Sequence, residues 1–364
     1  MAGLYAHIPF CRSRCIYCGF YSTTSLELRQ RYVDALCREA EMRPSDCITT
    51  IYLGGGTPSQ LTLPQLRQLF DALYIYNKVE PNAEVTIECN PDDVTADFAD
   101  GLRELPVNRV SMGIQTFSDH RLHFLHRRHT ARQAQEAVSL LRQAGFCNIS
   151  VDLMYGFPDE TIDDWKSDIA QAIALGVEHI SAYCLMVEEG TPLYRMQTNP
   201  IDEELEREMY YTLIDRLEAA GYEHYEISNF ARPGFRSRHN SSYWNQTPYT
   251  GLGAAAHSYD IRSRSWNVSD IRQYMEGIEQ GERRYEEELL DDDTRYNDTV
   301  TVALRTREGI DLGKLSDRYR HYCLREAQRS IDSGLLRLTH NRYLSLTRRG
   351  LFVSDMVMSD LIIL

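Results

Sequence analysis

Three cysteines stand close together near the start of the chain and limit its fold and chemistry more than any other feature. Cys11, Cys15 and Cys18 are spaced C-x₃-C-x₂-C and directly follow a predicted strand at Leu4–Ile8. Three thiolates from one tight loop can hold three irons of a 4Fe–4S cubane and leave the fourth iron open to an outside ligand. A structural zinc site would need a fourth Cys or His, and this segment has none downstream. The spacing therefore predicts an iron–sulfur cluster, with three unrelated thiols as the alternative.

The composition is that of a globular protein with an acidic balance. Among 364 residues, 39 basic and 53 acidic side chains give a net charge of −14. This charge gives the chain no electrostatic reason to bind nucleic acid, so we expect no nucleic-acid partner. The first residues lack a basic stretch followed by an apolar one, so no signal peptide is predicted and a cytoplasmic location is expected. The six cysteines outside the cluster are then expected to be free thiols.

The first 230 residues alternate short β-branched runs with amphipathic runs, which predicts repeated βα units. The predicted strands are Leu4–Ile8, Thr50–Leu53, Glu84–Glu88, Arg109–Gly113, Ser150–Met154 and His179–Leu185. The predicted helices between them include Leu26–Met42, Pro64–Tyr76, Ala131–Ala144 and Ile162–Leu175. Repeats of this kind predict an α/β fold with a parallel sheet, and six units are expected to form an open barrel rather than the full eight.

The rest of the chain is expected to form two further parts. Ala231–Ser242 is predicted to be a loop, and the acid-rich stretch Glu282–Asp293 a solvated linker or domain boundary. The last 70 or so residues are predicted to be mainly helical, with a strand pair near Leu335–Leu338 and Tyr343–Leu346, as in a winged-helix-like module. A structural or lid role is favoured for it over DNA binding because the chain is acidic. The expected divisions are 1–230, 231–293 and 294–364.

The cysteine spacing after the first strand resembles the signature of the radical-SAM superfamily. That resemblance implies a partial (β/α)₆ barrel with its site at the C-terminal ends of the strands, in agreement with the alternation of elements. It also implies a 4Fe–4S cluster whose open iron chelates S-adenosylmethionine (SAM), and whose electron cleaves SAM to a 5′-deoxyadenosyl radical. Whether SAM is cleaved here is not readable from the sequence.

The wider pattern resembles one subfamily, the anaerobic coproporphyrinogen III oxidases and their relatives. The matching segments are YAHIPFC, LGGGTPS, TIECNP, SMGIQTF, LHRRHT and VDLMYGFP, in order along the chain. By this resemblance a set of residues is expected to contact SAM: Tyr5, Tyr17, Gly55, Gly56, Thr57, Glu88, Gln115, Arg127 and Asp152. Met186 and His257 also stand where the family has adenosine contacts. Arg127 can pair with the SAM carboxylate through its planar fork of donors. Glu88 and Asp152 can accept hydrogen bonds from the ribose hydroxyls or the ammonium of SAM.

Two features separate the branches of this subfamily. The oxidases carry a fourth cysteine two positions after the third, and this chain has Phe20 at that position. The oxidases also carry an N-terminal extension ahead of the cysteines, whereas only ten residues precede Cys11 here. Both features argue against porphyrinogen decarboxylation. Whether the chain is an enzyme at all is therefore left uncertain, since the radical-SAM core is intact but the fourth Cys is replaced.

A later motif, HNSSYW at residues 239–244, resembles the motif of the haem-chaperone branch. In an exposed loop His239 is a plausible axial ligand for haem iron, and Tyr243 and Trp244 can pack against a flat macrocycle. The alternative is a polar loop with two aromatics packed inward.

The resulting hypothesis is a haem chaperone that binds haem and transfers it to acceptor haem proteins, among them respiratory membrane proteins. The alternatives are an oxygen-independent coproporphyrinogen III oxidase or another radical-SAM porphyrin enzyme, and a cluster-bearing binding protein. A homodimer through the apolar C-terminal helix is an expectation that the sequence leaves open.

Overall fold

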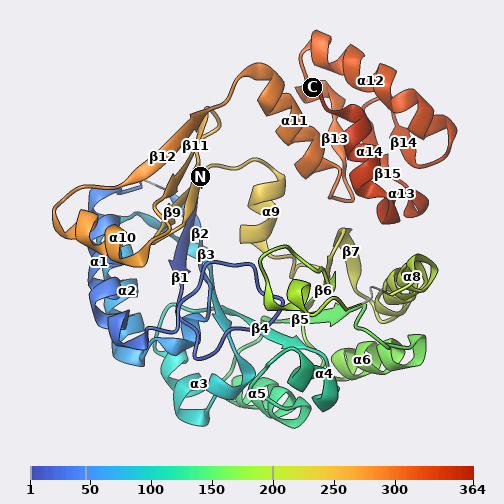
Figure 1. The fold of residues 1–364 in the computed structure, drawn as a ribbon. Helices are drawn as coiled ribbons and strands as arrows, with labels where there is room; N and C mark the ends of the chain where they lie inside the picture. The colour runs from blue at the N-terminus through green and yellow to red at the C-terminus, as the bar shows by residue number, and fades with distance from the viewer. Residues whose placement is uncertain (1, 46, 199–200) are drawn as a thin grey trace.

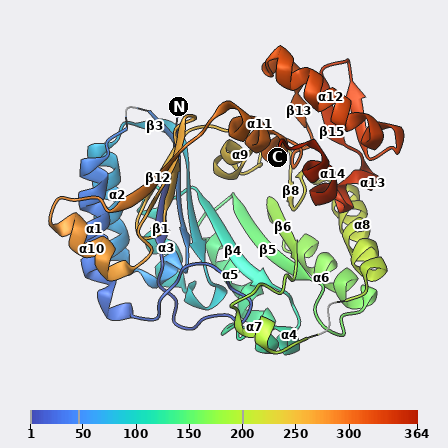
Figure 2. The same cartoon turned by 45° about the horizontal axis from the view of Figure 1, so that its top comes forward.

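Six parallel strands form the central part of the molecule, a curved wall that is open on one side (Figures 1 and 2). The computed structural model describes residues 2–45, 47–198 and 201–364. The wall has the order β1-β2-β3-β4-β5-β6, and its neighbours are paired in parallel. These strands are β1 Ala2–Ile8, β2 Ile48–Gly55, β3 Val79–Cys89, β4 Arg109–Gln115, β5 Ile149–Tyr155 and β6 His179–Cys184. The six predicted strands and the partial barrel are confirmed.

Helices cover the outer face of the wall, and Figure 2 shows them as a ring around it. Their starts follow ordinary capping chemistry. The side chain of Thr62 accepts a hydrogen bond from the backbone N–H of Gln65, and Thr130 and Thr161 cap their helices in the same way. The main outer helices are α1 Arg29–Met42, α2 Leu63–Tyr76, α3 Ala96–Arg103, α5 Ala131–Gln143, α6 Ile162–Ala174 and α8 Glu203–Ala219. The four helices named from the sequence are confirmed.

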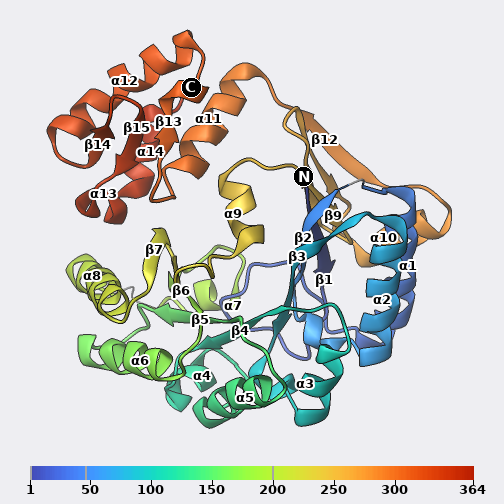
Figure 3. The same cartoon turned by 180° about the vertical axis from the view of Figure 1, so that it is seen from behind.

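The segment after residue 230 is more ordered than the sequence suggested. The expected loop Ala231–Ser242 contains the helix α9, Arg238–Trp244, which lies between the barrel and the C-terminal helices in Figures 1 and 3. The expected acidic linker contains a strand, β12, Tyr285–Leu289, paired antiparallel with β11 at Ser263–Asn267. The stretch is solvated as expected, but it is not an irregular linker: β12 is an edge strand whose side chains are all exposed, so its acids remain in water while its backbone is paired.

These later strands lengthen the barrel sheet at both ends. β9, Tyr249–Leu252, pairs in parallel with β1, and β10, His257–Tyr259, continues the sheet to β11. At the other end β8, Asn229–Ala231, and β7, Glu223–Glu226, follow β6 in antiparallel pairing. The whole sheet therefore has twelve strands, of which the parallel ones line the interior.

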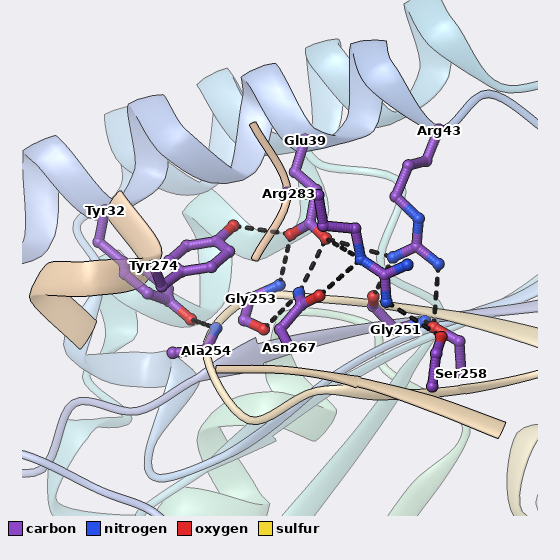
Figure 4. Close-up of polar contacts among 11 residues, drawn as sticks. Tyr32, Glu39, Arg43, Gly251, Gly253, Ala254, Ser258, Asn267, Tyr274 and Arg283 are labelled. Atoms are coloured by element: carbon purple, nitrogen blue, oxygen red, sulfur yellow. Dashed lines mark hydrogen bonds and ion pairs between the residues drawn. The ribbon is translucent and has the colours of Figure 1, made fainter. Parts of the chain in front are cut away.

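One buried carboxylate ties the added strands to the barrel (Figure 4). Glu39 on α1 is fully buried and accepts hydrogen bonds from Tyr274 Oη at 2.7 Å and Gly253 N at 2.8 Å. It also accepts one from Asn267 Nδ2 at 2.8 Å, and Arg43 Nη1 lies 3.2 Å from it. We call this group, completed by Arg283 and by Tyr32, the Glu39 clamp. It joins α1, the β9–β11 segment and α10, Ile271–Glu279.

The C-terminal residues form a smaller unit with its own apolar core. It contains α11 Asp292–Ala303, α12 Asp317–Asp332, α13 Arg348–Phe352, α14 Ser354–Leu361 and a three-stranded sheet of β13 Ile310–Asp311, β15 Tyr343–Leu346 and β14 Leu336–Thr339. The predicted strand pair and terminal helix are confirmed. None of the described helices is long and apolar enough to cross a membrane.

Candidate functional site

The concave interior of the barrel holds one continuous hollow with two parts. The larger part, which we call the barrel cavity, has a volume of about 720 Å³. The smaller part, the cysteine pocket, has about 180 Å³ and contains all three motif cysteines. Seven residues line both parts: Tyr17, Cys18, Phe20, Glu88, Ser111, Gln115 and Asp152. The volume of the barrel cavity lies within the range of small-molecule sites.

The three cysteines are half-buried free thiols that all line the cysteine pocket. Cys11 Sγ lies 3.5 Å from Thr57 Oγ1, Cys15 Sγ lies 3.6 Å from Arg127 Nη1, and the N–H of Cys18 donates to Cys15 O at 3.3 Å. Across the described residues, no three His, Cys, Asp or Glu side chains converge on a point that could hold a single ion. Three thiols that line one pocket without converging on a single ion fit three irons of a cubane better than a structural zinc ion.

The glycine motif after β2 forms one wall of the cysteine pocket. Gly55 has φ +111°, which favours glycine, and a Cβ on Gly56 would lie 2.7 Å from the carbonyl carbon of Pro9. Backbone groups therefore approach the pocket more closely than a larger residue would allow. Thr57 is buried beside them and completes this wall.

Arg127 brings a cation to the cysteine pocket. Its Nη2 donates to Asn90 Oδ1 at 2.9 Å and also to the carbonyl of Gly113. Its Nε is buried and has no partner among the described residues. A buried donor without a partner is costly, so the pocket has unused capacity for an anionic group at this point. A carboxylate such as that of SAM fits this requirement.

Two half-buried carboxyl groups line both parts of the hollow. Glu88 accepts hydrogen bonds from Tyr52 Oη at 2.7 Å and from the N–H of Gly55 at 3.1 Å. Burial raises the pKa of Glu88 to about 7 and that of Asp152 to about 6. Both groups can accept hydrogen bonds from a ligand that carries hydroxyl or ammonium groups, and neither is committed to an ion pair within 4 Å in the described part of the chain.

The remaining predicted SAM residues also line the hollow. Gln115 has φ +70° and lies at a register shift between β4 and β5. A non-glycine residue in this conformation is strained, and such strain is concentrated at functional sites. Tyr17 lines both parts, and Tyr5 lines the barrel cavity with its hydroxyl 3.0 Å from His7 Nδ1. The structure thus gathers all nine residues expected at SAM around one hollow, while their contacts with SAM stay a prediction.

The HNSSYW motif is helical and buried, not an exposed loop. Helix α9 is capped by Ser237, whose hydroxyl accepts from Asn240 N at 3.3 Å. The buried carboxylate of Glu84 accepts from the N–H groups of Arg238 and His239, at 3.0 and 2.9 Å. A negative charge at a helix start is favourable, so Glu84 fixes α9 against the barrel. The expectation of an exposed histidine was wrong because this charged contact was not visible from the sequence.

His239 is only 1% exposed, yet its ring reaches the barrel cavity. Its Nδ1 lies 2.8 Å from Thr50 Oγ1 and its Nε2 lies 2.8 Å from Tyr243 Oη. The ring stacks on Tyr52 with centroids 5.1 Å apart. Burial, reinforced by the positive charge of Arg109, lowers the pKa of His239 to about 3. The imidazole is therefore neutral at physiological pH, the form that ligates metals.

Not every predicted haem or adenosine residue reaches the hollow. Tyr243 lines the barrel cavity, but Trp244 does not and packs under the guanidinium of Arg305, 4.9 Å from its ring centre. Trp244 lies outside the cavity because adjacent residues of a helix face different directions, and its contact with a macrocycle stays a prediction. Met186 lines the cavity, whereas His257 is exposed and stacks on Trp266. Phe20, 70% exposed, lies at the rim.

Tyr52 and Arg109 are the most informative of the cavity residues that sequence reasoning missed. Tyr52 holds Glu88 and supports His239, and Arg109 is a buried cation on the cavity wall. A usable signal did exist for Arg109. It begins a predicted strand and stands two positions before Ser111, so both side chains face the same side of the sheet.

Known proteins resemble the chain over most of its length. Residues 5–172 match the model of the radical SAM superfamily. The heme chaperone HemW of Lactococcus lactis subsp. lactis is 34% identical over 321 residues, which are 87% of this chain and 84% of that protein. HemW of Bacillus subtilis is 36% identical, over 88% and 87% of the two chains, and HemW of Mycobacterium tuberculosis (strain H37Rv) is 35% identical, over 99% and 94%.

A solved structure resembles the whole fold. Coproporphyrinogen III oxidase (HemN) from Escherichia coli superposes with a TM-score of 0.86, covering 99% of this chain and 90% of that one. Its sequence identity is 22%, so this likeness speaks for the fold alone.

Proposed function

The chain belongs to the HemW family of haem chaperones within the radical SAM superfamily, and from that premise we propose that it binds haem and transfers it to acceptor haem proteins. The observation that carries the proposal is the placement of the motif histidine on the wall of a cavity large enough for a small-molecule cargo. Haem would be held there as cargo, with His239 as its protein ligand.

The surroundings of His239 suit an axial ligand. Thr50 can accept a hydrogen bond from Nδ1–H, which fixes the ring orientation and leaves the lone pair on Nε2. Nε2 lies on the side of Tyr243, whose hydroxyl occupies the position that an iron atom would need. Haem binding therefore requires the Tyr243 hydroxyl to move away, while the Thr50 contact stays in place. The low pKa of His239 means that no proton has to leave before the ring can ligate.

The residues of the cysteine pocket would hold the cluster and SAM, whose binding the family implies. When bound, the cluster offers an open iron that chelates SAM and an electron that can cleave it. Cys11, Cys15 and Cys18 would hold the irons. Arg127 would pair with the SAM carboxylate, and the Gly55–Gly56 backbone would lie against the methionine part. Glu88, Gln115 and Asp152 would accept or donate hydrogen bonds to the rest of the molecule.

The wider setting follows from the same proposal. All nine cysteines are free thiols, as expected in a reducing compartment, so we place the protein in the cytoplasm. Its partners would be acceptor haem proteins, among them respiratory membrane proteins. A homodimer through the C-terminal helix remains part of this proposal and can be tested by sedimentation.

The test is an anaerobic haem titration of the cluster-reconstituted protein, followed by the Soret band. We expect saturable one-to-one binding, and a dissociation constant at least about tenfold higher in His239→Ala. His257→Ala is the matched control, because this histidine is exposed and outside the hollow, and it should bind haem like the wild type. No saturable binding by the wild type would overturn the proposal.

A turnover assay with coproporphyrinogen III tests the enzymatic alternative. Phe20 cannot supply a thiolate at the rim, so we expect no conversion of coproporphyrinogen III when SAM and a reductant are present. 5′-Deoxyadenosine formed in step with protoporphyrinogen IX would identify the protein as an oxidase instead.

A further inference from the structure

One cation in the barrel cavity has no visible role in holding the fold. Arg109, at the start of β4, is 1% exposed and lines the cavity. Its Nε and Nη1 are buried, and within residues 2–45, 47–198 and 201–364 neither has a hydrogen-bond partner. A buried guanidinium that lacks its hydrogen bonds is unfavourable by itself. An unpartnered buried guanidinium of this kind indicates that a ligand with acceptor atoms binds beside it.

The neighbouring carboxylates of Glu88 and Asp152 do not form an ion pair with the Arg109 guanidinium. The positive charge of Arg109 lowers the pKa of Glu88 and Asp152 only as a minor contribution beside their burial. No acidic oxygen of the described residues lies within 4.0 Å of its nitrogens. The guanidinium therefore compensates these acids from a distance, and its planar fork of donors stays free.

Arg109 lies at the end of the hollow that is distant from the cysteines. Alternate residues of β4 face the interior, from Arg109 through Ser111 and Gly113 to Gln115. At about 3.3 Å per residue, Arg109 and Gln115 are roughly 20 Å apart along the strand. Arg109 lines the barrel cavity and Arg127 lines the cysteine pocket, so the two guanidinium groups serve different parts of the hollow, although the charges of both act on Asp152.

Arg109 shares its level in the barrel with the haem motif. It is in register with Thr86 of β3, which is in register with Tyr52 of β2. His239 stacks on Tyr52, and its pKa responds to the charge of Arg109. A ligand held by His239 therefore has Arg109 within its surroundings. Because two carboxyl groups also line the cavity, a singly charged carboxylate suits the site better than a doubly charged phosphate.

We propose that Arg109 binds a propionate carboxylate of haem and so selects which edge of the macrocycle enters the barrel cavity. This inference rests on the proposed haem-binding function and adds the group that orients the cargo. The fork can donate two parallel hydrogen bonds to one carboxylate, the strongest arrangement for this pair. The other source of a carboxylate is the methionine part of SAM, which the test separates from haem.

The test compares haem with haem dimethyl ester, in which both propionates are blocked, on the cluster-reconstituted protein. We expect the ester to bind at least about tenfold more weakly than haem to the wild type. Arg109→Gln should weaken haem binding to the level of the ester, and should leave ester binding unchanged. Arg132→Gln removes an exposed arginine from α5 and should behave like the wild type. SAM affinity should be the same in all three proteins.

Each other outcome has one meaning. Equal binding of haem and ester to the wild type, or full haem affinity in Arg109→Gln, would overturn the role of Arg109 and leave the haem function intact. A loss of SAM affinity in Arg109→Gln with unchanged haem affinity would assign the fork to SAM and also overturn the inference. Absence of saturable binding for both porphyrins would remove the proposed function itself. If Arg109→Gln fails to hold its cluster, the ester comparison in the wild type and the Arg109→Lys variant decide.

Discussion

The molecule contains two buried groups of charged side chains that are built from the same residue types in opposite ways. The Glu39 clamp and the barrel cavity each combine a buried carboxylate with arginines and tyrosines. In the clamp, Glu39 accepts from three donors at 2.7–2.8 Å with Arg43 beside it, and Arg283 donates to Asn267 and Ser265 at 2.7 and 3.1 Å. In the cavity, Arg109 has two unpaired nitrogens and Arg127 has one.

The difference separates polar groups that hold the fold from polar groups that wait for a ligand. A fully satisfied buried network rigidifies a structure, whereas an incomplete one is unfavourable until its partners arrive. The clamp joins α1 to strands more than 200 residues away, and only a smaller pocket of about 270 Å³ lies beside its Arg43 and Arg283. The barrel groups surround about 720 Å³ of space. Removing a group from the clamp should therefore cost much more stability than removing a cation from the cavity.

The largest effect is expected for Glu39→Ala. This change leaves Arg43, Asn267 and Tyr274 without their shared acceptor in a buried site, which should lower the free energy of unfolding by about 3–5 kcal/mol. Urea unfolding followed by circular dichroism measures it. Glu41→Ala on the exposed side of the same helix is the control and should change stability by less than about 0.5 kcal/mol. A small loss for Glu39→Ala would mean that the clamp does not hold the added strands.

Two buried arginines offer a direct comparison of the sets. Arg283→Met removes two hydrogen bonds and leaves Asn267 and Glu39 with fewer donors, so a loss of about 2–3 kcal/mol is expected. Arg109→Met removes a buried cation whose Nε and Nη1 find no hydrogen-bond partner among the described residues, and a change within about 1 kcal/mol is expected. Both variants are measured by urea unfolding without haem or SAM. Equal losses would contradict the view that the two groups are built differently.

The pH dependence of stability should come partly from Glu88. Its pKa is about 7 in the folded protein against 4.5 when unfolded, so the folded state holds the proton more tightly. Its contribution to stability is then complete below about pH 4.5 and is lost as the pH rises to about 7. The loss is about 3 kcal/mol. Glu88→Gln should remove this part of the decline between pH 5 and pH 8 in urea unfolding. An unchanged decline would show that Glu88 is ionised throughout.

Local patterns predicted the barrel well because their physical cause is local. The βα alternation reflects burial of one helix face and of whole strands, and the glycine and cysteine motifs are short in sequence. The strand β12 was missed because an edge strand needs no buried side chain, and Glu286, Glu287 and Glu288 resemble a solvated run. Nothing in those residues shows the pairing with β11, which depends on the fold around it.

The sequence predicted which residues belong to the candidate site better than it predicted how they are buried and oriented. The nine expected SAM residues surround one hollow because parallel strands place their ends together. The burial of His239 depends on Glu84 and Thr50, which lie 155 and 189 residues away in the chain. Such long-range contacts leave no trace in a motif, so HNSSYW indicated a metal ligand but not that it is a neutral, buried and oriented one.

The smallest effect in this series is expected for Thr50→Val, which tests how the cavity orients its histidine. Valine keeps the β-branched shape in β2 but removes the hydrogen bond to His239 Nδ1, so stability should fall by about 1 kcal/mol. The ring then loses its fixed orientation, and the haem dissociation constant should rise by about tenfold. Thr49→Val is the matched control, because the Thr49 hydroxyl makes only a long hydrogen bond of 3.5 Å to Ala2 O and, as the next residue of the strand, faces the opposite side from Thr50. If Thr50→Val weakens stability without changing haem affinity, Thr50 belongs with the structural groups of the clamp and not with the groups that serve the ligand.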